Sequence, residues 1–259
     1  MDMAGSGRTA LLEDLRDQVA RIERRPLAPG RATAIPFGLP ALDDALHEGG
    51  IARGALHEIA GSGPDTEHGA AAALLAASVL AHAAGPVLWV SPYFDLFAPA
   101  LAEVGLGPDR VLHVEASRNV LAAMEEGLRH PGLAGVVGEV PGRLSLTASR
   151  RLQLAAEGTG AVAFAIRRSA RHDDPALAEP SAAVTRWRVA SLPSAPPLPW
   201  SPETPGLGRA RWRLELLRAR GGEPRSWIVE CPDAQGRLAL AADLADRPPA
   251  EGQRHRAAG

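Results

Sequence analysis

The stretch IPFGLPALDDALHEGGIARGALHEIAGSG, residues 35–63, decides how the main domain begins. Residues 39–46 predict a short helix that ends at Gly49-Gly50, because glycine is a common helix terminator. Residues 55–60 are predicted to form a strand. This strand leads into a glycine-containing loop, residues 61–69, and then into a helix. Such a strand–loop–helix unit is where many proteins bind phosphate groups, because the helix N-terminus attracts anions.

The sequence after this loop alternates apolar helices with short apolar runs. Helices are predicted over residues 67–84, 97–104, 117–129 (with Ser117 as N-cap) and 145–157. Strands are predicted over residues 86–91, 111–114, 133–140 and 161–166. Continuous apolar strands separated by helices predict an α/β fold, in which helices cover both faces of a mostly parallel sheet.

The C-terminal third has a different character. Residues 191–208 carry six prolines, and strands with alternating arginine and apolar residues are predicted around them, over 184–190, 211–218, 226–231 and 237–241. We interpret them as an antiparallel extension of the same sheet. The predicted organisation is therefore an N-terminal helix and linker (1–33), a core (34–170), the antiparallel extension (171–246) and a disordered polar tail (247–259).

The N-terminal segment predicts an amphipathic helix over residues 10–24. Its apolar face consists of Leu11, Leu12, Leu15, Val19 and Ile22. The prolines at 26 and 29 end this helix. The sequence leaves two interpretations open: the apolar face packs on the chain's own core, or it binds another molecule.

Composition excludes several kinds of chemistry. The chain contains no lysine, so its 28 basic residues are all arginine and it can form neither a Schiff base nor a phosphate-loop lysine contact. The net charge of −2 gives no overall attraction to nucleic acid or to acidic membranes. A single cysteine, Cys231, and the absence of a signal-peptide or membrane-spanning pattern lead us to expect a cytoplasmic protein that does not contact membranes.

The 35–63 stretch resembles the start of the RecA core, in which a Gly-Leu-x-x-Leu-Asp helix leads through a double-glycine turn to the phosphate-loop strand. The resemblance continues in a strand end that bears Glu139 and in a strand that ends at Arg167, where RecA-like proteins carry a nucleotide-sensing polar residue. The phrase RWRLELLRARGGEPRSWIVE, residues 211–230, is similar to the C-terminal region of the ImuA family, which are RecA-like accessory factors of bacterial mutagenic translesion synthesis. The resemblance spans roughly residues 9–247.

The same comparison implies that ATP cleavage is lost. A phosphate loop needs a lysine for the β and γ phosphates and a Ser or Thr for Mg²⁺. The degenerate loop here instead comprises Gly61, Ser62, Gly63, Asp65, Thr66, Glu67 and Gly69. We expect Asp65 and Glu67 to repel a triphosphate and to cap the following helix. Glu139 is a degenerate Walker B carboxylate, and the segment after the second core strand offers only Asp95 in place of a catalytic glutamate. We therefore expect no enzyme activity, no cofactor and no metal.

Two further groups are candidate contact residues. Tyr93, Phe94 and Phe97 lie in one loop, where they either anchor a protein partner or cover a core left open by the missing nucleotide. Arg167, Arg168 and Arg171 cluster after a strand, in the region that RecA uses for DNA, and are candidates for a weak DNA contact.

The resemblance implies an SOS-induced accessory role without catalysis. The implied partners are an ImuB-type Y-family-like polymerase homologue, RecA and an error-prone replicative-type DNA polymerase. Two alternatives remain: a SulA-like cell-division inhibitor that binds the bacterial tubulin homologue, and a RecA-like recombination ATPase. The missing lysine counts against the ATPase.

Overall fold

The computed structural model describes residues 33–172, 174–198 and 200–241. In chain order the elements are β1 (Ala34–Ile35), α2 (Pro40–Asp43), β2 (Ile51–Ala52), β3 (Leu56–Gly61), α3 (Asp65–Ala81), β4 (Val87–Ser91), α4 (Ala98–Ala102), η1 (Pro108–Arg110), β5 (Val111–Glu115), η2 (Ser117–Asn119), α5 (Val120–Arg129), β6 (Gly135–Pro141), α6 (Leu146–Thr159), β7 (Val162–Arg168), η3 (Pro175–Ala178), β8 (Thr185–Leu192), β9 (Arg211–Ala219), β10 (Arg225–Glu230) and β11 (Ala239–Leu240).

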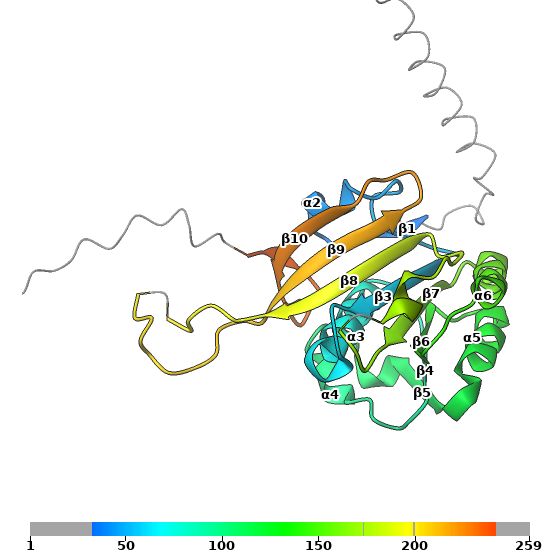
Figure 1. Ribbon diagram of the computed structural model, residues 1–259, viewed down its shortest axis with the longest axis horizontal. Helices are drawn as coiled ribbons and strands as arrows, with labels where there is room; N and C mark the ends of the chain where they lie inside the picture. The colour runs from blue at the N-terminus through cyan, green and yellow to red at the C-terminus, as the bar shows by residue number, and fades with distance from the viewer. Residues whose placement is uncertain (1–32, 173, 199, 242–259) are drawn as a thin grey trace, which may run out of the picture. The chain divides into compact units, whose positions relative to one another are not determined.

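A nine-stranded sheet forms the centre of the fold, with the strand order β11-β10-β9-β8-β3-β7-β6-β4-β5 (Figure 1). The six strands from β8 to β5 are parallel, and β9, β10 and β11 pair antiparallel at the other edge. The predicted α/β class, with a mostly parallel sheet and antiparallel C-terminal strands, is thus confirmed. β1 and β2 form a separate two-stranded antiparallel sheet.

One strand differs from the prediction. β8 was expected to belong to the antiparallel extension, but it pairs in parallel with β3, so the antiparallel part begins at β9. The connection from β7 to β8, residues 169–184, is long enough to run back to the start of the sheet, as a parallel crossover requires. Apart from residue 173, which lies outside the described residues, this connection contains only the short 3₁₀ turn η3. Without a helical pattern, the sequence did not reveal a crossover.

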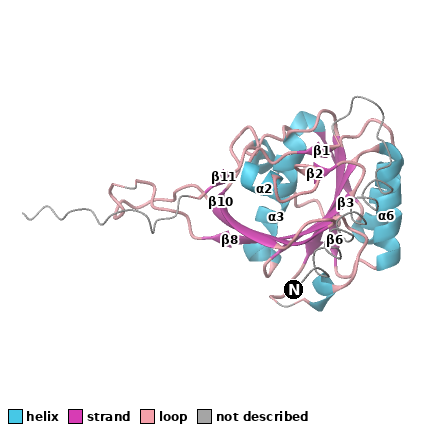
Figure 2. Cartoon of the chain, turned by 90° about the horizontal axis from the view of Figure 1, so that it is seen from above, coloured by secondary structure: helices cyan, strands magenta, loops and turns pink. Residues whose placement is uncertain are grey.

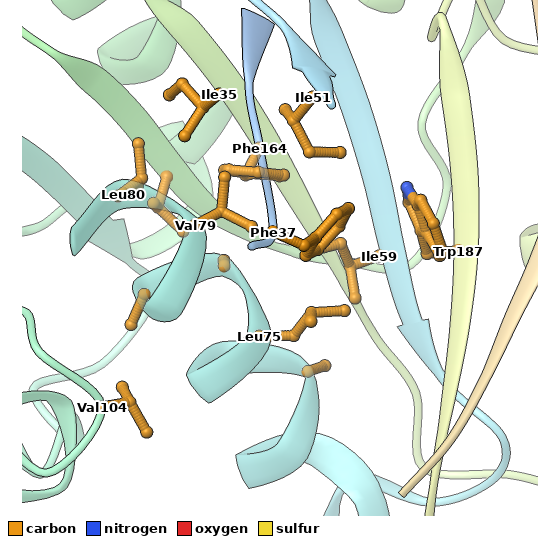
Figure 3. Close-up of a cluster of buried hydrophobic side chains, with 14 of the residues drawn as sticks. Ile35, Phe37, Ile51, Ile59, Leu75, Val79, Leu80, Val104, Phe164 and Trp187 are labelled. Atoms are coloured by element: carbon orange, nitrogen blue, oxygen red, sulfur yellow. The ribbon is translucent and has the colours of Figure 1, made fainter. Parts of the chain in front are cut away.

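Helices cover both faces of the parallel part. Figure 2 shows α3 on one side of the sheet and α6 on the other. α3 is apolar around most of its circumference, because it lies between the sheet and α4 rather than at the surface. The apolar cluster between α3 and the sheet includes Leu75, Val79 and Phe164, together with Trp187 of β8 (Figure 3). A second apolar cluster lies under α5 and α6.

The starts of two predicted helices can be compared with the structure. The helix predicted to begin at Ser145 begins one residue later, at Leu146, and Ser145 is its N-cap, whose hydroxyl oxygen accepts a hydrogen bond from the amide of Ala148 at 3.2 Å. The prediction for Ser117 was wrong: this residue has a φ of 46° and begins the 3₁₀ turn η2, and α5 starts only at Val120. A residue in that left-handed conformation cannot adopt the extended backbone of an N-cap.

The C-terminal end of α3 is closed by a side chain from a distant segment. The guanidinium of Arg110 donates to the carbonyl oxygens of Leu80, Ala81, Ala83 and Gly85. The last carbonyls of a helix lack intrahelical partners and carry partial negative charge. Arg110 therefore provides hydrogen-bond donors for the carbonyls at the end of α3 and links this helix to the start of β5.

Candidate functional site

Four charged side chains meet at the carboxyl end of the parallel strands, where α/β sheets place their ligand sites. They come from four segments: Asp65 from the start of α3, Asp95 from the loop after β4, Glu139 from β6 and Arg168 from the end of β7. Strand order explains the meeting, since β3, β7, β6 and β4 are consecutive neighbours in the sheet. We call these four residues the Arg168 cluster.

Arg168 is the centre of this cluster. Its Nη1 lies 2.7 Å from Glu139 Oε2, its Nε lies 2.9 Å from Asp65 Oδ2, and its Nη2 lies 3.6 Å from Asp95 Oδ2. One guanidinium thus binds three carboxylates. A RecA-like ATPase holds its nucleotide and metal between the phosphate loop and the acidic strand end, and here an internal cation bridges these two elements.

Burial controls the electrostatics of the cluster. Glu139 is only 3% exposed, and its other oxygen, Oε1, accepts a hydrogen bond from the indole N–H of Trp89 at 2.9 Å. Burial raises the pKa of Glu139, while the Trp89 hydrogen bond and Arg168 act in the opposite direction. Burial likewise raises the pKa of Asp65 against the opposing effect of Arg168. Arg168 therefore compensates for part of the cost of burying these two carboxylates.

The degenerate phosphate loop is short and occupied by the protein itself. Ser62, Gly63 and Pro64 alone separate β3 from α3. The amide of Ser62 donates to the carbonyl of Val189, and the amide of Asp65 donates to the carbonyl of Ser169, at 2.9 and 2.8 Å. Amides that would face a phosphate in a functional loop are thus bonded to β8 and to the residue after β7.

Side chains also fill the space around the loop. A Cβ built on Gly63 would lie 2.8 Å from Nδ1 of His172, and one on Gly61 would lie 2.9 Å from Cβ of His68. Thr66 and Gly69 lie in the first turns of α3. The glycines therefore serve close packing of the loop against two histidines.

The predicted capping of α3 by its acidic residues takes a different form. The N-cap residue is Pro64, and no side-chain hydrogen bond caps this helix end. Asp65 instead accepts from the amide of Ser169 at 3.0 Å and binds Arg168. Glu67 is half exposed and lies 3.8 Å from His68. Both carboxylates still lie in the first turn, where they interact favourably with the helix dipole.

Arg167, next in sequence to Arg168, points to a separate buried site. It is 2% exposed, and its Nη1 lies 3.0 Å from Glu58 Oε2 in the middle of β3. Its Nη2 donates to the carbonyls of Gly142 and Ala176, and Arg186 is a second cation near Glu58 at 3.4 Å. The prediction of Arg167 as a DNA contact is therefore wrong, because its guanidinium does not reach solvent.

The three arginines predicted to act together are in fact dispersed. Arg167 is buried with Glu58, Arg168 binds the three carboxylates, and Arg171 alone is exposed. Consecutive residues of a strand point to opposite faces, which explains the separation of the first two. The sequence signal that was missed is Glu58, a single carboxylate within the buried strand LHEIAG, because a buried charge needs a partner.

The aromatic loop after β4 is exposed. Tyr93, Phe94 and Phe97 are 70%, 73% and 70% exposed, so they do not cover the core. Phe94 lies against His113 of the edge strand β5, with ring centroids 4.4 Å apart. Phe97 forms part of a groove of about 600 Å³ whose other wall includes Arg209 and Cys231. Exposed aromatic rings beside a groove favour the interpretation of this loop as a protein contact.

Three further points concern the predicted N-terminal apolar face, metal binding and membrane-spanning helices. Leu11, Leu12, Leu15, Val19 and Ile22 lie outside the described residues. Within residues 33–241, as far as they are described, no group of three or more His, Cys, Asp or Glu side chains is arranged to hold a metal ion. None of the described helices is both long and apolar enough to cross a membrane.

Comparison with known proteins addresses the fold and the family. The crystal structure of the RadB recombinase superposes with a TM-score of 0.58 at 15% identity and covers 80% of this chain and all of RadB, which shows a RecA-like fold. No family model matches the chain. Protein ImuA from two strains of Caulobacter vibrioides, NA1000/CB15N and ATCC 19089/CB 15, is 37% identical over 210 residues, which is 77% of this chain and 84% of each relative. The chain belongs to the ImuA family.

Proposed function

We propose that this protein is a non-catalytic accessory factor in SOS-induced, error-prone translesion DNA synthesis. It connects RecA with polymerase components through protein–protein contacts. The proposed partners are an ImuB-type Y-family-like polymerase homologue, RecA and an error-prone replicative-type DNA polymerase, and the proposed location is the cytoplasm. Membership of the ImuA family supports a role in this mutagenesis system.

The observation that carries the non-catalytic part of the proposal is the Arg168 cluster. A guanidinium bound to Asp65, Asp95 and Glu139 leaves these carboxylates satisfied by an internal cation. The chain has no lysine that could contact the β and γ phosphates, and two loop amides are bonded to backbone carbonyls. A RecA-like ATPase is the competing proposal. Measurable Mg²⁺-dependent ATP turnover by the purified chain, abolished in Glu139→Ala, would support it instead.

Two surfaces are proposed for partner binding. One is the exposed loop with Tyr93, Phe94 and Phe97. The other is the apolar face of the N-terminal segment, which has the i, i+4, i+7 spacing of helices that bind in grooves. We expect Leu15→Asp to abolish partner binding, because it places a charge in that apolar face. Arg16→Asp introduces the same side chain on the polar face and is the matched control.

The test is an affinity purification from DNA-damaged cells, followed by direct binding measurements with purified proteins. Recovery of the Y-family-like homologue, with or without RecA, supports the proposal if Leu15→Asp loses the complex and Arg16→Asp keeps it. Recovery of the bacterial tubulin homologue would favour the SulA-like alternative. A folded Leu15→Asp variant that retains its partners would exclude the N-terminal surface.

For a weak DNA contact, we keep only Arg171 as a candidate residue. Of the three candidate arginines, Arg171 is exposed, whereas Arg167 and Arg168 are engaged with carboxylates. We expect Arg171→Ala to lower the affinity for single-stranded DNA only slightly, because a single phosphate contact contributes little. Raising the salt concentration should lower this affinity more than the substitution does.

A further inference from the structure

The connection between β8 and β9 is unusual for an antiparallel hairpin. Most such hairpins turn within two to five residues, and connections longer than roughly 12–15 residues without secondary structure usually carry a function. Here the connection comprises residues 193–210. Figure 1 shows this yellow segment reaching beyond the ends of β8 and β9, away from the sheet. We call residues 193–208 the proline arm.

Two observations indicate that the proline arm has a defined shape. A Cβ on Gly208 would lie 2.1 Å from the carbonyl oxygen of Ala195, so the two sides of the arm approach at a position that only glycine allows. At its tip the amide of Ser201 donates to the carbonyl of Leu198, and the amide of Thr204 donates to the carbonyl of Ser201, both at 3.0 Å. The five prolines at described positions of the arm (193, 196, 197, 202 and 205) further restrict the backbone.

The arm presents the most exposed large apolar side chains of the described residues. Trp200 is 80% exposed and Leu207 is 90% exposed. The other tryptophans are buried or partly buried: Trp89, Trp187, Trp212 and Trp227. An exposed tryptophan on a preorganised backbone is the kind of residue that dominates the free energy of protein–protein binding, because a large apolar area is buried with little loss of entropy.

The charge of the arm indicates the chemistry of its partner. Between Leu192 and Gly208 the only charged residue is Glu203. Binding to nucleic acid or to an acidic membrane surface depends on basic residues, and the arm has none. Proline-rich segments with apolar side chains are instead bound by protein clefts lined with aromatic rings.

We propose that the proline arm is a docking element that inserts Trp200 and Leu207 into an apolar, aromatic-lined cleft of a protein partner. The inference rests on the proposed function, because the partner is taken to be one of the proteins of that complex. The arm acts as the ligand, and the partner supplies the cleft. The base of the arm, at Arg209 and Ala210, lines the same groove as Phe97, so the arm and the aromatic loop can contact one partner surface.

The experiment measures binding of the full chain, separately, to the purified Y-family-like homologue, to RecA and to the error-prone replicative-type polymerase, at low and high salt. We expect Trp200→Ala to weaken binding to one of them roughly tenfold or more, and high salt to change the affinity little, because the arm carries almost no charge. Leu154→Ala, which removes a 66% exposed leucine on α6, is the control and should bind as the unaltered chain does. Unchanged thermal unfolding of both variants would show that they fold.

Fluorescence gives a second readout. Trp200 is the most exposed tryptophan, so the difference in acrylamide quenching between the unaltered chain and Trp200→Ala reports on this residue. We expect the partner to shield it. Gly208→Val keeps Trp200 but forces apart the two sides of the arm, and we expect it to weaken binding as well.

The outcomes separate this inference from the proposed function. If the unaltered chain binds none of these three proteins, the proposed function fails and this inference fails with it. If it binds but Trp200→Ala binds equally well, the proline arm is not the contact and the proposed function stands. Self-association that is lost in Trp200→Ala would make a second copy the occupant and would likewise overturn the inference.

Discussion

The buried histidine of β3 predicts how stability depends on pH. His57 is fully buried, and its Nε2–H donates to the carbonyl of Ala52 at 2.9 Å. Its Nδ1 accepts from the hydroxyl of Thr185 at 2.7 Å, and that hydroxyl oxygen accepts from the indole N–H of Trp187 at 2.9 Å. This chain of donors and acceptors is satisfied only by the neutral ring.

Burial lowers the pKa of His57 from 6.5 to about 4, against the opposing effect of the hydrogen bond to Ala52. Between these two pH values the unfolded chain binds a proton that the folded chain does not. The free energy of unfolding therefore falls as the pH falls from 6.5 to about 4. The slope is about 1.4 kcal/mol per pH unit, or about 3 kcal/mol over the window. Above pH 6.5 both states are neutral at His57, and this residue contributes no slope.

The assay is urea-induced unfolding at a series of pH values from 4.5 to 7.5, with His57→Gln as the test variant. Glutamine retains hydrogen-bonding capacity but does not titrate, so the slope should flatten even if the variant is less stable at neutral pH. The raised pKa values of Asp65 and Glu139 produce an opposite slope, which both proteins share and which cancels in the comparison. His130→Gln, which removes an exposed histidine, is the matched control for the substitution itself. Equal slopes in the unaltered chain and in His57→Gln would refute the reasoning.

Three further substitutions test the charged contacts, each by urea denaturation at neutral pH. Arg168→Met should cost about 2 kcal/mol, less than the range for fully buried pairs because Arg168 is 29% exposed. The loss should shrink at lower pH as Glu139 becomes protonated, and a constant loss would argue against the ion pair. Glu58→Gln should cost about 3–5 kcal/mol, because it leaves the 1% exposed guanidinium of Arg167 without its carboxylate. The double variant Glu58→Leu/Arg167→Leu should regain much of this, whereas additive losses would contradict the pairing. Arg110→Ala should cost about 1–3 kcal/mol by freeing the carbonyls at the end of α3, and a change below 0.5 kcal/mol would show that water replaces the guanidinium.

Local sequence patterns were sufficient for most strands of the central sheet and for the helices that cover it. The short, largely apolar runs of β4, β6 and β7 and the apolar length of α3 predicted a parallel sheet covered by helices, because strands buried on both faces need mostly apolar side chains. The missing lysine likewise indicated a degenerate phosphate loop before any geometry was known. Both conclusions depend only on residue type and local order.

Pairing between distant segments was not predictable in the same way. β8 joined the sheet in parallel because its connection crosses back along the sheet, and the sequence of 169–184 carries no signal for that path. Arg167 and Arg168 appeared to form one cationic cluster, yet strand alternation directs them to opposite sides.

The sequence by itself determined the element types, the α/β class and the absence of a phosphate-binding lysine, because these follow from local periodicity and composition. Only the tertiary structure decided that Arg168 joins carboxylates from residues 65, 95 and 139, and that Arg167 is buried with residue 58. The physical reason is that an ion pair depends on distance in space, and the order of strands in the sheet sets that distance between segments far apart in the chain.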